Sequence, residues 1–470
     1  MINKMTGLLG LLLLGTTWTA LAAPPGSGAD QLVQHEEQRA LDAALSAIVE
    51  DAAHPLASLS VLAIRHGKVS YQQQFGYRHI GATPAENLPV TPATLFRIAS
   101  VSKMMTTLGL MRLVEQGKLS LDQDVGIYLG FSLRNPHFPQ QPLTLRSLLS
   151  HTSSLRDAGG YAWGPERSLR DVFTAGGDTM WDSNAAPGRY FTYANLNWGV
   201  IGTVMEKVTG ERFDLLMRRL LLDPLQLRGG YHPAAFSQAE LANTATLYRK
   251  RTLDTEEWRP AGPWIAQADD VYRRPPAVPA GLANYVIGSN ATVFSPTGGL
   301  RISAAGLGTV MQMLLDGGRY QNQQLLQPAS IALMFGRQWQ LAPDASNGDS
   351  ERGLYRAWGL GNQQFDALAG QGNGLVEGAS FTAVGHLGDA YGLVSAFVLD
   401  FKNKNGMVLL VGGTGSDPTQ YPGTYSAMGR SEELILTTLY RGAIGKHESF
   451  ALKWCIPESY GCTMMFHWLP

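Results

Sequence analysis

A serine and a lysine separated by two residues form the first chemically informative pattern in the chain. Ser100 and Lys103 directly precede a long apolar stretch, residues 104–114. An interval of three residues places both side chains on the same face of a helix. A serine hydroxyl is a weak nucleophile unless a base accepts its proton, and a neighbouring lysine can be that base. The pattern predicts covalent catalysis by Ser100, although a Ser-x-x-Lys motif also arises by chance in a chain of this composition.

A second segment could supply a proton relay. The hydroxyl of Tyr193 can pass a proton between nucleophile and leaving group, and the amide of Asn195 can hold Lys103 or a substrate carbonyl. Another Tyr-x-Asn triplet occurs at residues 320–322, but it follows two glycines in a turn. Because Tyr193 instead opens an apolar helix predicted over 196–208, we favour Tyr193.

A third segment, His-Leu-Gly-Asp, begins at His386 and is expected on an edge strand that faces the serine. There His386 would line a cleft, and Gly388 would let a substrate approach the backbone closely. The backbone N–H of Asp389, together with that of Ser100, would form an oxyanion hole. A similar His-Ile-Gly at residues 79–81 lacks the long apolar strand that follows the later segment.

Other kinds of active site receive less support. His151 could be the histidine of a catalytic triad, but a capping or core role is commoner for a single histidine. The chain has neither the G-x-S-x-G motif of α/β-hydrolases nor the H-E-x-x-H motif of zinc proteases. Its 37 basic and 38 acidic residues nearly cancel, so nucleic acid is not expected as a partner. We expect a small-molecule or peptide substrate, with no cofactor and no metal.

The N-terminus has the pattern of a secretory signal peptide over residues 1–22. Lys4 precedes the apolar run 8–14, and Ala-Leu-Ala at 20–22 is a cleavage site. A membrane anchor is the alternative, but the apolar run is short for a span of ~20 residues. No cysteine lies near the cleavage site, which disfavours a lipoprotein. With a flexible leader at 23–30, the mature protein is expected to be periplasmic or secreted.

The C-terminal tail, residues 446–470, has no clear hydrophobic period and suggests no role. It contains the only two cysteines of the chain, Cys455 and Cys462. These could close a small loop in an oxidising compartment or could remain free thiols.

The hydrophobic pattern between these ends predicts one domain over residues 31–445. Strands near both ends and helices between them favour an antiparallel sheet flanked by terminal helices and interrupted by a mostly helical lobe. The sheet lobe would comprise about 31–99 and 350–445, and the helical lobe about 100–349. Residues 236–290 carry Pro, Trp and mixed charge, and we expect them to form a long surface insertion.

Individual elements follow from the same pattern. A hairpin with an Asn-Gly turn is expected over residues 402–406. The predicted strands are 59–64, 69–75, 381–385, 393–399 and 407–411. The predicted helices are 31–53, 100–116, 144–149, 196–208, 212–222, 306–315 and 432–441.

Taken in order, six segments resemble the serine β-lactamase-related superfamily, the penicillin-binding-protein-like group that includes class C β-lactamases, DD-carboxypeptidases, D-aminopeptidases and esterases. The resemblance runs from about Ser58 to about Ala443 and is carried by residues 96–103, 113–122, 148–153, 193–195, 298–300 and 385–388. It implies an α/β (α+β) fold of the β-lactamase/transpeptidase type and neither cofactor nor metal.

The resemblance also implies roles for single residues. Ser100 would be the acylated nucleophile, with Lys103 and Tyr193 as general base and proton shuttle. Asn195 would contact the lysine or the substrate, and the segment from His386 to Gly388 would be the family's third motif.

Two residues depart from the pattern of carboxylate-binding members: Leu387 stands where Thr is usual, and Asp389 where Ser or Thr is usual. His386 stands where class C β-lactamases have Lys, although DD-carboxypeptidases and D-aminopeptidases of the group use His. The lost hydroxyl and the added negative charge should disfavour a substrate carboxylate. An ester, or an amide with a free amine that Asp389 could meet, fits better, unless Asp389 points away and caps a turn.

The sequence thus predicts an exported serine hydrolase that forms an acyl-enzyme on Ser100. Its substrate would be a peptidoglycan-type or D-amino-acid peptide, or a carboxylic ester. A DD-carboxypeptidase or weak β-lactamase is the alternative among enzymes. A catalytically silent cell-wall-binding protein is the alternative outside enzymes, although a decayed site usually loses one of Ser100, Lys103 and Tyr193.

Overall fold

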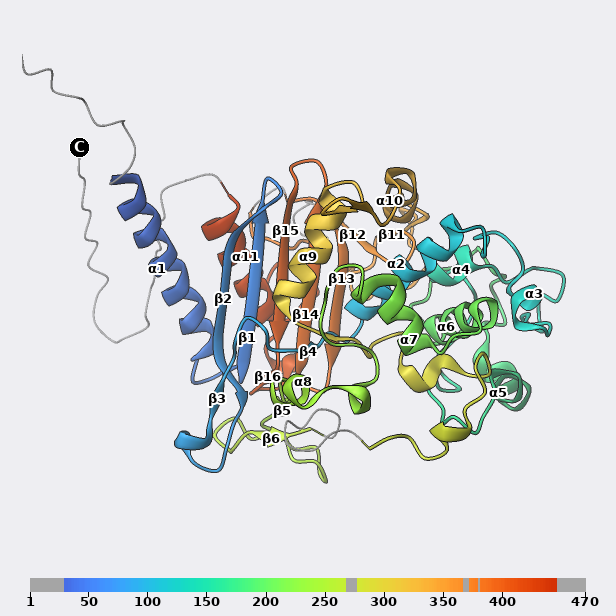
Figure 1. Ribbon diagram of the computed structural model, residues 1–470, viewed down its shortest axis with the longest axis horizontal. Helices are drawn as coiled ribbons and strands as arrows, with labels where there is room; N and C mark the ends of the chain where they lie inside the picture. The colour runs from blue at the N-terminus through green and yellow to red at the C-terminus, as the bar shows by residue number, and fades with distance from the viewer. Residues whose placement is uncertain (1–28, 268–276, 367–371, 379–380, 446–470) are drawn as a thin grey trace, which may run out of the picture.

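One nine-stranded antiparallel sheet forms the centre of the protein (Figure 1), with the strand order β10-β11-β12-β13-β14-β15-β1-β2-β3. The computed structural model describes residues 29–267, 277–366, 372–378 and 381–445. The predicted signal peptide and the C-terminal tail with both cysteines lie outside the described residues. The antiparallel sheet flanked by helices confirms the predicted fold class.

The sheet is built from strands at both ends of the described chain. Its N-terminal strands form a hairpin, and β1 pairs with the C-terminal strand β15 on its other side. The strands of the sheet are β1 (Ser58–Arg65), β2 (Lys68–His79), β3 (Leu88–Pro89), β10 (Trp339–Gln340), β11 (Ala357–Trp358), β12 (Gln363–Phe365), β13 (Ala383–Ala390), β14 (Leu393–Asp400) and β15 (Asn405–Val411).

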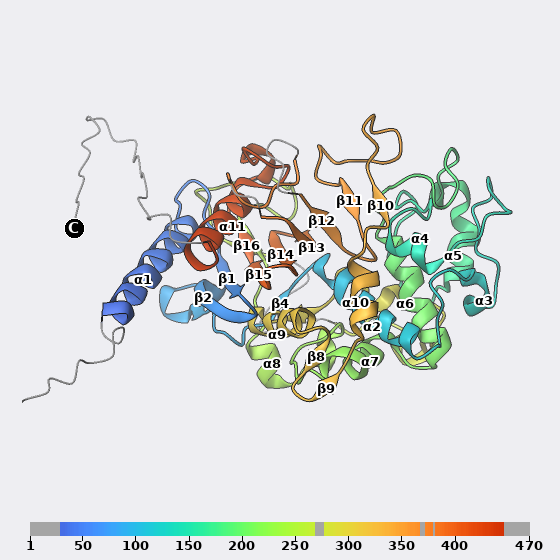
Figure 2. The same cartoon turned by 90° about the horizontal axis from the view of Figure 1, so that it is seen from above.

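Helices cover both faces of the sheet (Figures 1 and 2). Helix α1 (Ala29–Val49) packs on α11 (Arg430–Ala443) across one face, and α9 (Ala304–Leu315) lies on the other. Alternate residues of β1 pack into the cores on the two faces of the sheet, because successive side chains of a strand point to opposite faces. Val61 packs in the core beneath α1 and α11, whereas Leu62 packs in the core that contains α9.

The helical lobe follows β1 and β2 in the chain and lies beside the sheet (Figure 1). Its central helices, α2 (Val101–Glu115) and α6 (Leu196–Thr209), are apolar on nearly all sides and are buried. A left-handed Gly210 ends α6, as the sequence predicts. The other helices here are α3 (Val125–Leu129), α4 (Leu145–Leu149), α5 (Leu169–Gly176), α7 (Phe213–Met217) and α10 (Pro328–Phe335).

Two local predictions were wrong. The Asn-Gly pair does not form the hairpin turn, because Asn405 pairs with Asp400 and already belongs to β15. The carboxylate of Asp400 instead accepts the N–H of Lys402, and Lys404 takes the left-handed conformation. Residues 236–290 are not simply a surface insertion, because their described part contains a short helix, two strands and fully buried side chains.

Further short elements come from this region and its surroundings. Strand β16 (Gly413–Thr414) continues the chain after β15 and pairs with β5 (Tyr248–Arg249), which pairs with β6 (Ile265–Ala266). Two two-stranded sheets and one helix also occur: the antiparallel pair of β4 (Phe96–Arg97) and β7 (Arg301–Ile302), the hairpin of β8 (Arg319–Tyr320) and β9 (Gln323–Gln324), and α8 (Gln238–Ala242).

Candidate active site

Ser100 lies immediately before the first turn of α2. The preceding residue, Ala99, has a φ of 42°, so the chain enters the helix through a left-handed residue. The body of α2 is buried in the core of the helical lobe, which fixes the helix and therefore the serine at its N-terminal end. A helix N-terminus favours negative charge, including the charge that develops on a reacting serine oxygen.

Lys103 is fully buried and reaches three oxygen atoms. Its Nζ lies 2.8 Å from Ser100 Oγ, 2.8 Å from Asn195 Oδ1 and 3.2 Å from the carbonyl oxygen of Thr297. Burial lowers the pKa of Lys103 to about 7, and the charge of Asp157 opposes this shift. A neutral amine has two N–H donors and one lone pair. The amide and the carbonyl oxygens can take the donors, which leaves the lone pair for the Ser100 hydroxyl.

Tyr193 shares a hydrogen bond with Ser100 and is held between two rings. The imidazole of His151 stacks on the Tyr193 ring at 4.4 Å, and the ring of Tyr355 stacks at 5.4 Å. Burial raises the pKa of Tyr193 well above 10, and the hydrogen bond with Ser100 offsets this only in part. At neutral pH the side chain is therefore a phenol, which can donate a proton and pass one on.

Asn195 is oriented by a carboxylate that the sequence analysis missed. Asp157 accepts the backbone N–H of Asn195 at 2.8 Å, its side-chain amide at 3.0 Å, and the N–H of Leu196 at 3.0 Å. Because the amide nitrogen donates to Asp157, the amide oxygen must face Lys103. Neither Asp157 nor Thr297 stands in a recognisable motif with Asn195, since each lies far from it in the sequence.

His386 is buried and offers an acceptor rather than a charge. Its Nδ1 donates to the carbonyl of Leu387, so the proton lies on Nδ1 and the lone pair on Nε2. Burial, together with the charge of Lys103, lowers the pKa of His386 to about 3. Its Nε2 has no hydrogen-bond partner within the described residues, and the side chain lines a cleft.

Strand β13 brings Gly388 against Ser100. A Cβ atom placed on Gly388 would lie 2.9 Å from the backbone nitrogen of Ser100 and 2.8 Å from the carbonyl oxygen of Ile98, so only glycine fits there. The predicted edge strand needs correction. β13 pairs with β14 throughout but with β12 only up to Gly385, so just the segment from His386 onward is open on that side.

Asp389 reaches the same open side. Its side chain is exposed to the cleft, yet surrounding protein raises the pKa of its carboxyl, while Arg249 opposes that shift. Arg249 comes from the region that the sequence suggested was a surface insertion. That region therefore forms part of the wall of the cleft.

All seven predicted site residues line one cleft of about 1040 Å³ or lie directly beneath it. Lys103 lies beneath the floor, behind Ser100. The rival triplets at residues 320–322 and 79–81 do not line it. The residues on its wall include Ser100, Tyr193, Asn195, His386, Gly388, Asp389, Arg249 and Glu432.

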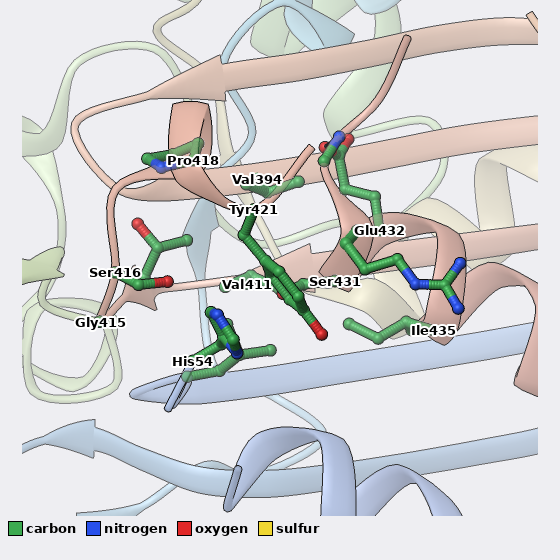
Figure 3. A pocket seen from close by; sticks show the side chains of 14 residues that line it. His54, Val394, Val411, Gly415, Ser416, Pro418, Tyr421, Ser431, Glu432 and Ile435 are labelled. Atoms are coloured by element: carbon green, nitrogen blue, oxygen red, sulfur yellow. Dashed lines mark hydrogen bonds between the residues drawn. The ribbon is translucent and has the colours of Figure 1, made fainter. Parts of the chain in front are cut away.

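A second, smaller pocket adjoins this cleft near the N-terminus of α11 (Figure 3). The rings of His54 and Tyr421 line this pocket and stack directly on each other, with their centroids 3.5 Å apart. Glu432 and Val394 line both spaces. The pocket holds no arrangement of nucleophile and base, so the large cleft is the candidate site.

Over the described residues, no group of three or more His, Cys, Asp or Glu side chains could hold a metal ion. In that same part of the chain, no helix combines the length and apolarity needed to cross a membrane.

Comparisons with known proteins agree with this architecture. The chain is 26% identical to Protein flp of Staphylococcus aureus (strain N315) over 172 residues, which are 36% of this chain and a third (33%) of that protein. The octameric penicillin-binding protein homologue from Pyrococcus abyssi superposes with a TM-score of 0.58 at 22% identity, over 81% of this chain and 74% of that one.

A further solved structure gives the same result. EstCE1, described as a hydrolase with promiscuous acyltransferase activity, superposes with a TM-score of 0.58 at 22% identity, over 87% of this chain and 100% of that one. At such identity these likenesses show the fold alone. Comparison with protein families matches residues 36–427, most of the chain, to the family described as Beta-lactamase. The chain therefore belongs to the Beta-lactamase family.

Proposed function

We propose that the protein is a serine hydrolase that forms an acyl-enzyme on Ser100 and cleaves an ester or amide bond. One observation carries the proposal: a buried lysine, its pKa lowered to about 7, lies 2.8 Å from the serine hydroxyl with its two other contacts satisfied by acceptors. Such a lysine is available as a general base at neutral pH. A silent binding protein would have no need of this arrangement.

Acylation follows from the contacts. The Ser100 hydroxyl gives its proton to Lys103 Nζ as Ser100 Oγ bonds to the substrate carbonyl carbon. The oxyanion that forms would lie between the backbone N–H groups of Ser100 and Asp389. The bond from carbon to the leaving group then breaks, and the leaving group receives the proton from Lys103 through the Tyr193 hydroxyl.

Deacylation reverses these roles. A water molecule gives one proton to the Lys103–Tyr193 pair as its oxygen bonds to the acyl carbon. The bond from that carbon to Ser100 Oγ breaks, the serine recovers the proton, and the acid product leaves. Because the pKa of Tyr193 is raised well above 10, Lys103 is the group that first takes the proton in each half-reaction.

The cleft favours substrates without a carboxylate at the third motif. The uncharged His386 supplies no cation there, Leu387 supplies no hydroxyl, and Asp389 adds a carboxyl group. A substrate carboxylate would meet acceptors where it needs donors. An ester, or an amide of a peptide with a free amine such as a D-amino-acid peptide, meets groups that it can bind. The names of EstCE1 and of the penicillin-binding protein homologue are compatible with either class.

We also infer that the protein is exported through the signal sequence at residues 1–22, which lie outside the described part of the chain. N-terminal sequencing of the protein from a secretion-competent host tests this. Cleavage after residue 22 is expected, and an intact N-terminus in the cytoplasmic fraction would contradict it.

Intact mass after incubation with a fluorophosphonate, and separately with a fluorescent penicillin, tests the proposed function. We expect fluorophosphonate labelling that Ser100→Ala abolishes and that Ser168→Ala, a change at a helix cap outside the cleft, leaves intact. Labelling by the penicillin as well would support a DD-carboxypeptidase or weak β-lactamase. No labelling by either reagent would overturn the serine nucleophile and favour a binding protein.

A further inference from the structure

His151 binds, through two hydrogen bonds, the extended segment that carries Tyr193 and Asn195. Its carbonyl oxygen accepts the N–H of Thr192 at 2.9 Å, and its ring Nδ1 accepts the N–H of Ala194 at 3.0 Å. In an extended chain, N–H groups two residues apart point to the same side, so one residue can accept both. His151 itself has a φ of 56°, in a left-handed region that histidine enters more readily than most residues.

The Ala194 contact fixes the tautomer of this ring. A backbone N–H can only donate, so Nδ1 must carry the lone pair and Nε2 the proton. The Asn197 side-chain amide approaches the same Nδ1 at 3.2 Å, and its oxygen accepts the Ser153 hydroxyl at 2.7 Å. The segment around His151 and the start of α6 are thereby joined through side chains of both.

The surroundings of the ring keep it uncharged. The imidazole is buried among the rings of Tyr193, Trp198 and Trp358, at 4.4, 5.0 and 4.9 Å. Burial lowers its pKa well below 6.5, and a positive charge on Lys103 or on His386, the titratable groups that face it besides Tyr193, lowers it further. A protonated ring would turn an N–H towards the Ala194 N–H and would repel Lys103.

We propose that His151 is a positioning residue for acylation: its unprotonated Nδ1 and its flat ring hold Tyr193 and Asn195 in register with Ser100 and Lys103. This inference rests on the proposed function of Ser100. His151 does not line the cleft, so it acts through the residues that it holds and not on the substrate. This positioning role also gives a physical reason for the segment around His151 and the segment 193–195 to occur together in one chain.

Two substitutions separate the hydrogen bond from the ring. His151→Phe keeps an aromatic ring but leaves the Ala194 N–H without an acceptor, whereas His151→Asn keeps an acceptor near the place of Nδ1 and tolerates the left-handed backbone. We expect the rate constant of fluorophosphonate labelling to fall about 100-fold in His151→Phe, the scale of loss from a misplaced catalytic group, and about tenfold or less in His151→Asn.

Steady-state kinetics with p-nitrophenyl acetate should place that loss in kcat, with KM within about twofold of the wild type, because the substrate contacts remain. His232→Phe is the matched control: this histidine is half-buried, lies edge-on to Phe294 and is outside the cleft. It should leave both constants unchanged. Wild-type rates in His151→Phe, or equal losses in the Phe and Asn variants, would overturn the role of Nδ1.

A spectroscopic measurement on the wild-type protein keeps the inference testable if His151→Phe does not fold. Nitrogen-15 histidine spectra, with His151 assigned by its loss in His151→Asn, should show the proton on Nε2 and no titration between pH 8 and pH 5. A proton on Nδ1, or titration in this range, overturns the inference. Absence of fluorophosphonate labelling in the wild type would overturn the proposed function instead and would leave this spectroscopic answer unaffected.

Discussion

At the scale of single residues, the site separates its proton-handling groups by environment. Burial disfavours the charged form of each group, so it lowers the pKa of Lys103 and raises that of Tyr193. The amine becomes able to accept a proton near pH 7, while the phenol keeps its own. The two groups interact, so a measured pH profile reports the apparent behaviour of the pair.

The first prediction concerns the pH dependence of acylation. The wild-type rate should rise about tenfold per pH unit below pH 7 and level off above it, as Lys103 loses its proton. The charge of Asp157 favours protonated Lys103, so Asp157→Asn should lower the pKa of the lysine and move the midpoint about half a unit to lower pH. Stopped-flow fluorophosphonate labelling between pH 5 and pH 9 measures both midpoints.

Asp178→Asn is a suitable control for this experiment, because that carboxylate is exposed, pairs with His137 and, unlike Asp157, does not shift the pKa of Lys103. Its midpoint should equal that of the wild type. A shift of the Asp157→Asn midpoint to higher pH would contradict the electrostatic argument, since removing a negative charge cannot stabilise a cation.

At the scale of elements, the approach of β13 to the start of α2 is the most constrained contact of the site. Gly388 has no room for a side chain against Ser100, and the Ser395 hydroxyl of β14 donates to the Ile98 carbonyl at 2.8 Å. The two strands therefore fix the position of Ser100 relative to the segment from His386 to Gly388. This contact also sets the distance between the two proposed oxyanion donors.

Gly388→Ala tests that constraint. Its Cβ would lie 2.5 Å from Ser395 Oγ and 2.9 Å from Ser100 N, so the strand must move away. We expect fluorophosphonate labelling to slow about 100-fold and the free energy of unfolding to fall by about 1–3 kcal/mol. Gly374→Ala, whose Cβ would meet only Tyr425 at 3.8 Å, should change neither quantity. Unchanged labelling in Gly388→Ala would show that the contact is dispensable.

The identity of the side chains on β13 gives a third prediction. Leu387→Thr combined with Asp389→Ser supplies hydroxyl donors and removes a negative charge, so a substrate carboxylate should bind better. We expect the rate constant of labelling by fluorescent penicillin to rise about tenfold or more, which corresponds to one added hydrogen bond to a charged group. Asp389→Asn alone separates the charge from the hydroxyl. No gain, with fluorophosphonate labelling intact, would show that carboxylate exclusion arises elsewhere.

The elements that sequence predicts well are those whose signals are local. The apolar run before Gly210, for example, is enough to place α6 and its end. The hairpin between β14 and β15 forms as predicted, but its turn does not fall on Asn405-Gly406, because the capping of the turn by Asp400 outweighs the preference of that pair for a turn. The described part of residues 236–290 lacks a sequence signal for burial, because buried residues such as Ala245, Leu247 and Tyr248 lie in a short segment with no repeating hydrophobic pattern.

The same distinction holds for the site. Ser100, Lys103 and Tyr193 stand in motifs that are each readable over a few residues, so they could be chosen from sequence, and the fold brings them together. Asp157 and Thr297 could not, because their importance arises only from contacts with Asn195 and Lys103 across the fold. The acceptor character of His386 likewise depends on a hydrogen bond that only coordinates reveal.

At the scale of the whole molecule, the two lobes are not independent. One continuous core joins the inner face of the sheet, including Leu62 and Phe397, to the helices of the lobe, including Met104 and Trp198. The site residues come from α2, from the segment before α6 and from β13, so the cleft exists only when the lobes are packed together. Loss of global stability should therefore remove the site as a unit.

Acid should destabilise the protein for a reason that lies within this site. In the unfolded chain His386 takes up a proton as the pH falls through about 6.5, whereas in the folded protein burial holds its pKa at about 3. Between these values the unfolded state binds one more proton, so this residue lowers the free energy of unfolding by about 1.4 kcal/mol for each unit that the pH falls.

His386→Gln should remove this dependence. The wild-type free energy of unfolding, measured by urea titration from pH 6 to pH 4, should fall relative to the variant by about 1.4 kcal/mol per pH unit. Burial raises the pKa of Glu432 to about 7, which acts in the opposite direction, but it does so in both proteins and cancels in the difference. His66→Gln, at an exposed turn, should follow the wild type. Parallel curves for the wild type and His386→Gln would mean that His386 is charged in the folded protein. A charged His386 would be a donor that attracts a substrate carboxylate, which contradicts the proposed preference for substrates without one.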